Sequence, residues 1–185
     1  QDRAFGFYYQ SDLDALRAAG AELVPFDTLH DAQLPAVDGL FIGGGFPERQ
    51  MTALADNRPL LADIRAFIEA GGPAYAECGG LMYLCRTLTW GEKRVTMAGV
   101  IAADVVMHPR PQGRGYTRLQ VLPGHPWLGA SEPWGIRAHE FHFSGLRDLD
   151  PSLHFGFRVE RGHGVDGQHD GLVCRNLVAN YCHLR

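Results

Sequence analysis

Two patterns of hydrophobic residues divide the chain into halves. In the first half, short apolar runs alternate with segments whose apolar residues recur every three or four positions, the spacing of one helix face. The runs predict strands within residues 4–9, 21–26, 37–45 and 73–76, and the periodic segments predict helices within 11–20, 59–72 and 79–88. This alternation favours a mostly parallel sheet with helices on both faces.

The second half, from about residue 92, reads as strands and turns. Its loops are rich in Gly, Pro and His, and its apolar stretches are too short for typical helices. The predicted strands lie within residues 98–107, 116–122, 135–144, 154–161 and 171–181. We expect antiparallel or mixed extensions of the same sheet, and therefore a single α/β domain over residues 1–185.

Composition narrows the classes of function. The net charge of −4 gives no broad basic field, so neither nucleic acid nor an anionic membrane surface is an expected partner. No apolar run approaches the roughly 20 residues that cross a bilayer. The four cysteines have neither zinc-site spacing nor the density of a disulfide scaffold, which favours reduced thiols in the cytoplasm.

Cys78 is the first candidate for chemistry. It follows a short apolar run and precedes Gly79 and Gly80 at the start of a predicted helix. This order is typical of a nucleophile elbow, in which small neighbours permit a strained turn. We expect the helix N-terminus to lower the pKa of the thiol and to donate to an oxyanion. Cysteine is also a common core residue, so the spacing leaves both interpretations open.

A glycine run, Gly43–Gly45 in "GGGFPE", ends another buried strand. Bare backbone here can approach a ligand closely, and its N–H groups could form the other half of an oxyanion hole. The run is not a Walker A loop, and that motif occurs nowhere in the chain. We therefore expect no ATP site within these residues.

A cysteine nucleophile needs a base, and nine histidines compete for that role. "RAHEFHFS" carries His139 and His142, but this is not the H-E-x-x-H spacing of a zinc site. His183 follows the apolar stretch "LVANYC". Spacing does not choose between His139 and His183 as base, and we predict no metal site.

Four segments in order, "GGGFPE", "YAECGGLMYL", "RAHEFHFS" and "DGLVCRNLVANYCHL", resemble the glutaminase domain of the cobyrinic acid a,c-diamide synthases. That group is the cobalamin-type branch of the class I (triad) glutamine amidotransferases. The resemblance implies a flavodoxin-like α/β fold in which Cys78 attacks the side-chain amide of glutamine. The thioester that forms is hydrolysed to glutamate, and ammonia is released.

The same resemblance implies roles for further residues. His183 is the expected general base and then general acid, and the backbone N–H groups of Gly44, Gly45 and Gly79 are expected to hold the oxyanion. His139 and Glu140, in the motif near the glutamine pocket, are candidates for contact with the substrate or for its support.

Two departures from the wider class concern the third triad residue. Ordinary class I glutaminases carry H-x-E, whereas Leu184 and Arg185 follow His183 here, so something else must orient the imidazole. The usual G-x-C-x-G around the nucleophile reads A-E-C-G-G. Glu77 is therefore either a carboxylate of the substrate pocket or a structural acceptor.

Full-length members of this family join the glutaminase to an N-terminal synthetase domain, which we expect to precede Gln1. ATP and Mg²⁺ belong to that domain, no cofactor is expected in this one, and the acceptor is a tetrapyrrole with acetate side chains. Sirohaem, nickel sirohydrochlorin and hydrogenobyrinic acid are alternative acceptors to cobyrinic acid. A stand-alone cysteine hydrolase, a silent binding domain and assembly as a homodimer also stay open.

Overall fold

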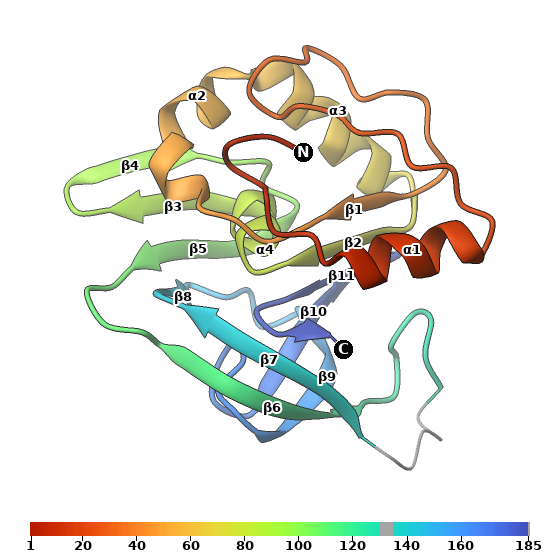
Figure 1. The fold of residues 1–185 in the computed structure, drawn as a ribbon. Helices are drawn as coiled ribbons and strands as arrows, with labels where there is room; N and C mark the ends of the chain where they lie inside the picture. Colours follow the sequence, from red (N-terminus) through yellow and green to blue (C-terminus); the bar gives the residue numbers. More distant parts are fainter. Residues whose placement is uncertain (130–134, 185) are drawn as a thin grey trace.

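The computed structural model describes residues 1–129 and 135–184 (Figure 1). Its first half contains the three predicted helices, the third of them shorter than predicted, and two of the four predicted strands. The elements in chain order are α1 (Gln10–Ala18), β1 (Leu40–Ile42), the 3₁₀ helix η1 (Pro47–Gln50), α2 (Met51–Asp56), α3 (Arg58–Glu69), β2 (Ala74–Glu77) and α4 (Gly79–Leu84).

The rest of the described chain is built from strands. They are β3 (Cys85–Trp90), β4 (Lys93–Thr96), β5 (Ile101–Met107), β6 (Gly113–Val121), β7 (Ile136–His142), β8 (Ser144–Arg147), β9 (His154–Arg161), β10 (His169–Cys174), β11 (Leu177–Asn180) and β12 (His183–Leu184).

Eight strands form the main sheet, in the order β1-β2-β11-β10-β9-β6-β7-β12. The pairs β1·β2 and β2·β11 are parallel, and the remaining neighbours are antiparallel. The expected extensions of the sheet are therefore present. The expectation of a mostly parallel sheet was wrong, because residues 4–9 and 21–26 form no strand and Phe7 makes only an isolated bridge to Gly44.

A second sheet, β4-β3-β5-β8, was not expected. Its strand β3 occupies residues that the helical periodicity assigned to the end of a helix, so Cys85 begins a strand instead of lying on a helical turn. Thr87 and Thr89 explain the change, because β-branched residues favour an extended backbone. Leu88 between them is fully buried, as expected for one face of a strand.

Helix α3 covers the sheet with the predicted apolar stripe. Leu60, Ile64 and Ile68 are fully buried in a core that also contains Ile42 of β1 and Leu81 of α4. Helix α1 is different, because none of its residues is buried and the side chain of its N-cap residue, Tyr9, makes no capping hydrogen bond. Among the described residues, no helix has the length and apolar character needed to span a membrane.

Candidate active site

Cys78 occupies a strained turn between β2 and α4. Its backbone has φ 48° and ψ −99°, a conformation that costs a non-glycine residue about 1–3 kcal/mol. The turn is held on both sides, because Cys78 N–H donates to the Asn180 carbonyl at 2.7 Å and Met82 N–H donates to the Cys78 carbonyl at 3.1 Å. The predicted elbow is thus present, and its geometry places Cys78 at the carboxyl end of a parallel strand.

Small residues are required next to this turn. A Cβ on Gly80 would lie 3.0 Å from the carbonyl carbon of Ile42, and a Cβ on Gly79 would lie 2.9 Å from the backbone nitrogen of Gly45. Side chains at either position would force α4 away from the end of β1. The elbow and the glycine run are therefore in direct contact.

The glycine run also lies against His183. A Cβ on Gly44 would lie 2.7 Å from Cε1 and 3.6 Å from Nε2 of the imidazole. The Cε1–Nε2 edge of the ring therefore faces Gly44, and the next residue, Gly45, contacts Gly79. The structure brings together all three glycines that the family resemblance singled out.

His183 comes from the strand at one edge of the main sheet. It lies on β12, which pairs with β7 so that His183 is opposite His139. Asp170, fully buried, accepts the backbone N–H groups of Tyr181 at 3.0 Å and Cys182 at 2.8 Å. This carboxylate fixes the two residues that lead into His183.

Glu77 orients the imidazole. Its Oε2 lies 3.0 Å from Nδ1 of His183, and its Oε1 accepts the Leu184 N–H at 3.2 Å and the Tyr75 hydroxyl at 2.7 Å. The carboxylate is buried, and Asn180 donates to the Tyr75 hydroxyl at 3.0 Å. The residue before Cys78 thus holds the Nδ1 edge of the imidazole in a chain that lacks the H-x-E glutamate.

His139 covers one face of the His183 ring. The two rings stack with centroids 4.9 Å apart and planes 18° apart, and Tyr9 Oη lies 2.9 Å from Nε2 of His139. Nothing in the sequence pointed to Tyr9, whose neighbourhood to residue 139 depends on the tertiary fold. Of the two residues in this motif, His139 therefore lies at the site.

Glu140 points elsewhere. Its carboxylate accepts the backbone N–H groups of His163 at 2.7 Å and Gly164 at 2.9 Å, and it lies 3.4 Å from Nε2 of His142. Burial raises the pKa of Glu140, but the hydrogen bonds from His142, Gly164 and His163 outweigh it and lower that pKa below its usual range. Its contacts are those of a residue that supports the loop at 163–164.

The thiol is protonated at neutral pH. Burial raises the pKa of Cys78 to about 12, against the opposing hydrogen bond from Gly79 N–H and with a further rise from the carboxylate of Glu77. The expectation of a lowered pKa was wrong, because burial outweighs the hydrogen bond from Gly79 and the nearby carboxylates of Glu77, Glu48 and Asp170 raise the pKa further.

A metal centre would need several ligands that converge on one point. Within residues 1–129 and 135–184, no three side chains of His, Cys, Asp or Glu converge to hold a metal ion. The chemistry available to these residues is that of a buried thiol, an imidazole fixed by a carboxylate, and a group of backbone donors.

Comparison with known proteins identifies the family of the chain. Residues 1–185 match the profile of the CobB/CobQ-like glutamine amidotransferase domain. The chain belongs to this family. The glutamine amidotransferase domain is also 48% identical over 183 residues, 99% of its length, to the cobyrinate a,c-diamide synthase of Magnetococcus marinus. It is 42% identical over 184 residues, its whole length, to the enzyme of the same name from Archaeoglobus fulgidus.

The domain spans 39% of the length of each of these two relatives. Solved structures confirm the class I glutamine amidotransferase fold. PurLQS from Thermotoga maritima aligns over the whole domain and 84% of its own chain with a TM-score of 0.66 at 16% identity. A glutamine amidotransferase from the same organism aligns over 93% of the domain and 68% of its own chain with a TM-score of 0.63 at 16% identity.

Proposed function

We propose that the domain hydrolyses glutamine through a Cys78 thioester. The ammonia would serve an ATP-dependent amidation of tetrapyrrole acetate groups, of the cobyrinate a,c-diamide synthase type. The observation that carries the proposal is the contact between Glu77 and His183 beside the strained Cys78 turn. A nucleophile, a base and a carboxylate that orients the base are the parts of an acyl-transfer site.

Each part has a defined step. Glu77 keeps a proton on Nδ1 of His183, so Nε2 is free to accept the thiol proton as sulfur attacks the amide carbon of glutamine. The backbone N–H groups of Gly79 and Gly45 stabilise the oxyanion of the tetrahedral intermediate. The N–H of Gly44, which the family resemblance also pointed to, donates instead to the carbonyl of Phe7 at 3.2 Å. His183 then returns the proton to the leaving nitrogen, and ammonia departs from a glutamyl thioester.

Hydrolysis of the thioester, the second half of the reaction, uses His183 as base and then acid again. A water molecule gives its proton to Nε2 of His183 while its oxygen attacks the thioester carbon. The second tetrahedral intermediate collapses, the proton passes to sulfur, and glutamate leaves with Cys78 restored as a thiol. Because the resting thiol is neutral, no ion pair has to be buried before glutamine binds.

The relatives support the proposed acceptor and the proposed further domain. Both named relatives are cobyrinate a,c-diamide synthases, which supports cobyrinate over sirohaem or nickel sirohydrochlorin as the acceptor. Their greater length leaves room for the expected synthetase domain, where ATP and Mg²⁺ would activate the carboxylate. The four free cysteines fit a cytoplasmic location, which is part of this proposal.

The test uses the full-length enzyme with either glutamine or ammonia as the nitrogen donor. Cys78→Ser should abolish glutamine hydrolysis and glutamine-dependent amidation of cobyrinate while ammonia-dependent amidation continues. Cys174→Ser, at a half-buried cysteine outside the site, is the matched control and should behave as wild type. Normal glutamine hydrolysis by Cys78→Ser would refute the proposal.

Experiments on the full-length enzyme also distinguish the proposed function from two alternatives, a peptidase and a silent binding domain. The glutamine analogue 6-diazo-5-oxo-norleucine should label Cys78, whereas a peptidase of this fold would not prefer that reagent. A silent binding domain would give ammonia-dependent amidation with no glutamine-dependent reaction in the wild-type protein, and that result would also overturn the assignment.

A further inference from the structure

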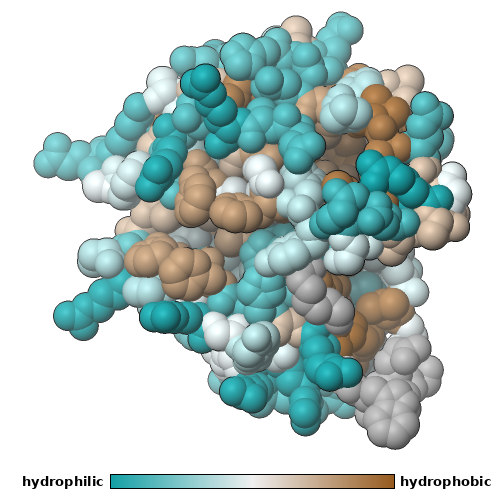
Figure 2. All heavy atoms as spheres, viewed as in Figure 1, coloured by the Kyte–Doolittle hydropathy of each residue, from teal (hydrophilic) through white to brown (hydrophobic). Residues whose placement is uncertain are grey.

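Strands β9, β6 and β7, which are neighbours in the main sheet, carry a cluster of exposed arginines. They are Arg114 and Arg118 of β6, Arg137 of β7, and Arg158 and Arg161 of β9. The whole chain has a net charge of −4, so its composition does not reveal this local excess of positive charge. In the view of Figure 2, hydrophilic residues predominate over the lower part of the molecule, where Figure 1 places β6 and β7.

Three of these arginines lie side by side across the three strands. Arg118 is opposite Arg137 of β7, and on its other side it is opposite Arg161 of β9. Thr117 and Leu119, its neighbours along β6, are buried, so the side chain of Arg118 lies on the outer face of the sheet. Residues opposite one another share a face. We refer to Arg137, Arg118 and Arg161 as the arginine row.

The arginine row has no internal counter-charge. Other arginines do pair, as Arg86 and Arg94 do with Asp104. In the part of the chain that the structure describes, no side chain of the arginine row makes a hydrogen bond or an ion pair. The three strands contain two acidic residues, of which Glu140 is buried and Glu160 is exposed. Like charges directly opposite one another destabilise a sheet, so the row is stabilised when an anion binds it.

The arginine row lies next to the candidate active site. His183 is opposite His139, which is opposite Tyr116, and these residues of β12, β7 and β6 occupy the next register position on the same face. Arg137 and His139 are two residues apart on β7, a separation of about 7 Å. The side chain of Tyr116 is 80% exposed. A ligand on the arginine row would therefore lie beside the two stacked imidazoles and could pack against Tyr116.

We propose that this face binds the side-chain carboxylates of the tetrapyrrole acceptor, with the arginine row as its ligands and Tyr116 against the macrocycle. The proposal rests on the proposed function and adds that the glutaminase domain itself forms part of the acceptor site. A guanidinium group can hold a carboxylate through two parallel hydrogen bonds, and several in a row suit a molecule with several acetate groups. The acceptor would thus lie next to the site that releases ammonia.

An open sheet face forms only one wall of such a site. Small-molecule sites are concave and bury most of their ligand. The domain spans 39% of the length of its Magnetococcus marinus relative, so a protein of that length has ample chain to cover the other side of the ligand. The expected synthetase domain would form the opposite wall, because it must activate the same carboxylate with ATP.

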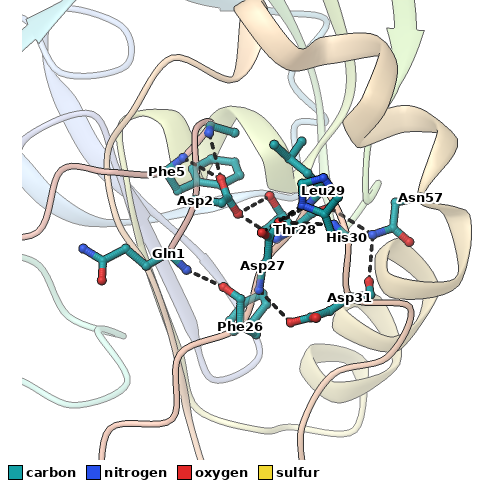
Figure 3. Close-up of polar contacts among 11 residues, drawn as sticks. Gln1, Asp2, Phe5, Phe26, Asp27, Thr28, Leu29, His30, Asp31 and Asn57 are labelled. Carbon is teal, nitrogen blue, oxygen red and sulfur yellow. Dashed lines mark hydrogen bonds and ion pairs between the residues drawn. The ribbon is translucent and has the colours of Figure 1, made fainter.

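Other anionic occupants fit the face less well. The net charge of −4 disfavours a nucleic acid. A second copy of the domain would have to supply carboxylates, and two of those near its amino terminus are already engaged (Figure 3). Asp2 accepts the N–H of Thr28 at 2.6 Å, and Asp27 accepts the N–H of Leu29 at 2.8 Å. The acceptor, whose reacting groups are carboxylates, matches the arginine row best.

The test measures the binding of cobyrinate to the full-length enzyme without glutamine. Arg118→Gln and Arg137→Gln should each raise the Kd about tenfold or more, because each removes hydrogen bonds to a charged group. Arg58→Gln, at an exposed arginine at the start of α3, is the matched control and should bind as wild type. An analogue whose side-chain carboxylates are all amides should bind equally to wild type and to Arg118→Gln. A Kd for cobyrinate within twofold of wild type in the double variant would overturn the proposal.

Kinetics of the same enzyme separate an acceptor site from a surface that docks another domain. With ammonia as the nitrogen donor, Arg118→Gln should raise the KM for cobyrinate, while the KM for glutamine hydrolysis should not change. An unchanged KM for cobyrinate, with glutamine hydrolysis that no longer yields amide, would assign the face to an acidic surface of the synthetase domain and overturn the proposal.

Two controls complete the test. The binding measurement contains no glutamine, so its result does not depend on Cys78 as the nucleophile and can fail or succeed independently of the proposed function. Denaturant unfolding of Arg118→Gln should give a midpoint no lower than that of wild type, because the substitution removes contacts between like charges. Weaker binding by this variant would then reflect the lost guanidinium group and not a loss of folded protein.

Discussion

Nδ1 of His183 lies 3.0 Å from Oε2 of Glu77, the residue that precedes Cys78 in the chain. The proposed nucleophile and the carboxylate that contacts the proposed base are thus neighbours at one strand end, while the base comes from the far end of the sequence. In the H-x-E arrangement the carboxylate follows the base. The relation explains how His183 can be oriented although the sequence has Arg185 where H-x-E has its glutamate.

Glu77→Gln should lower kcat for glutamine hydrolysis by about 10²- to 10⁴-fold with little change in KM. The amide NH₂ would face Nδ1 and favour the tautomer with a proton on Nε2, which cannot accept the thiol proton. Steady-state kinetics of the full-length enzyme checks this. Glu69→Gln, on the exposed side of α3, is the control, and a wild-type kcat in Glu77→Gln would contradict the role.

Gly44→Ala should also reduce kcat, because its Cβ would lie 2.7 Å from Cε1 of His183 and must displace the ring. A loss of about tenfold or more is expected, since misplacement of a reacting group by 1 Å can cost about 10²-fold. Gly39→Ala is the matched control, with its Cβ at an ordinary 3.5 Å from the Pro73 carbonyl. Equal kinetics for the two variants would show that the glycine loop does not need to contact His183.

Asp170→Asn should destabilise the domain by about 2–4 kcal/mol. The buried carboxylate accepts three backbone N–H groups, from Gly171, Tyr181 and Cys182, and an amide would direct its own N–H groups at some of them. Denaturant unfolding measures the loss. Asp14→Asn, on the exposed face of α1, should leave stability within about 0.5 kcal/mol, and an equally small change at Asp170 would contradict its structural role.

Alkylation of Cys78 should be slow at neutral pH and should still increase above pH 9. The thiolate is the reacting form, and burial raises the pKa of Cys78 to about 12 in the folded domain. Because the folded pKa exceeds the unfolded one, this thiol favours folding at low pH and loses that contribution as pH rises towards 12. Iodoacetamide rates, followed by mass spectrometry of the Cys78 peptide, test this. A plateau below pH 7 would contradict a neutral resting thiol.

The local motifs were more predictable than the contacts between them. Cys78, Gly79 and the glycine run could be assigned to strand ends because a short apolar run followed by glycine is a local signal. The pairing of Glu77 with His183 could not, since 106 positions separate the two and several strands must assemble first. Glu140 shows that a local motif can also mislead. The family motif made both His139 and Glu140 candidates for contact with the substrate, but only His139 lies against His183.

The missing strands have a related cause. Residues 21–26 have the composition of a strand, but a strand exists only when a neighbour completes its ladder. Beside β1 the described residues supply no such neighbour. Local preference therefore predicted an element that forms no ladder in the described part of the chain.

The covalent intermediate on Cys78 tests the central claim most directly. The full-length enzyme is mixed with glutamine, quenched in acid within milliseconds and digested for mass spectrometry. A glutamyl group on the Cys78 peptide, absent from Cys78→Ser and formed at the rate of ammonia release, is the predicted result. Ammonia release without that adduct, or with the adduct on another residue, would contradict the account.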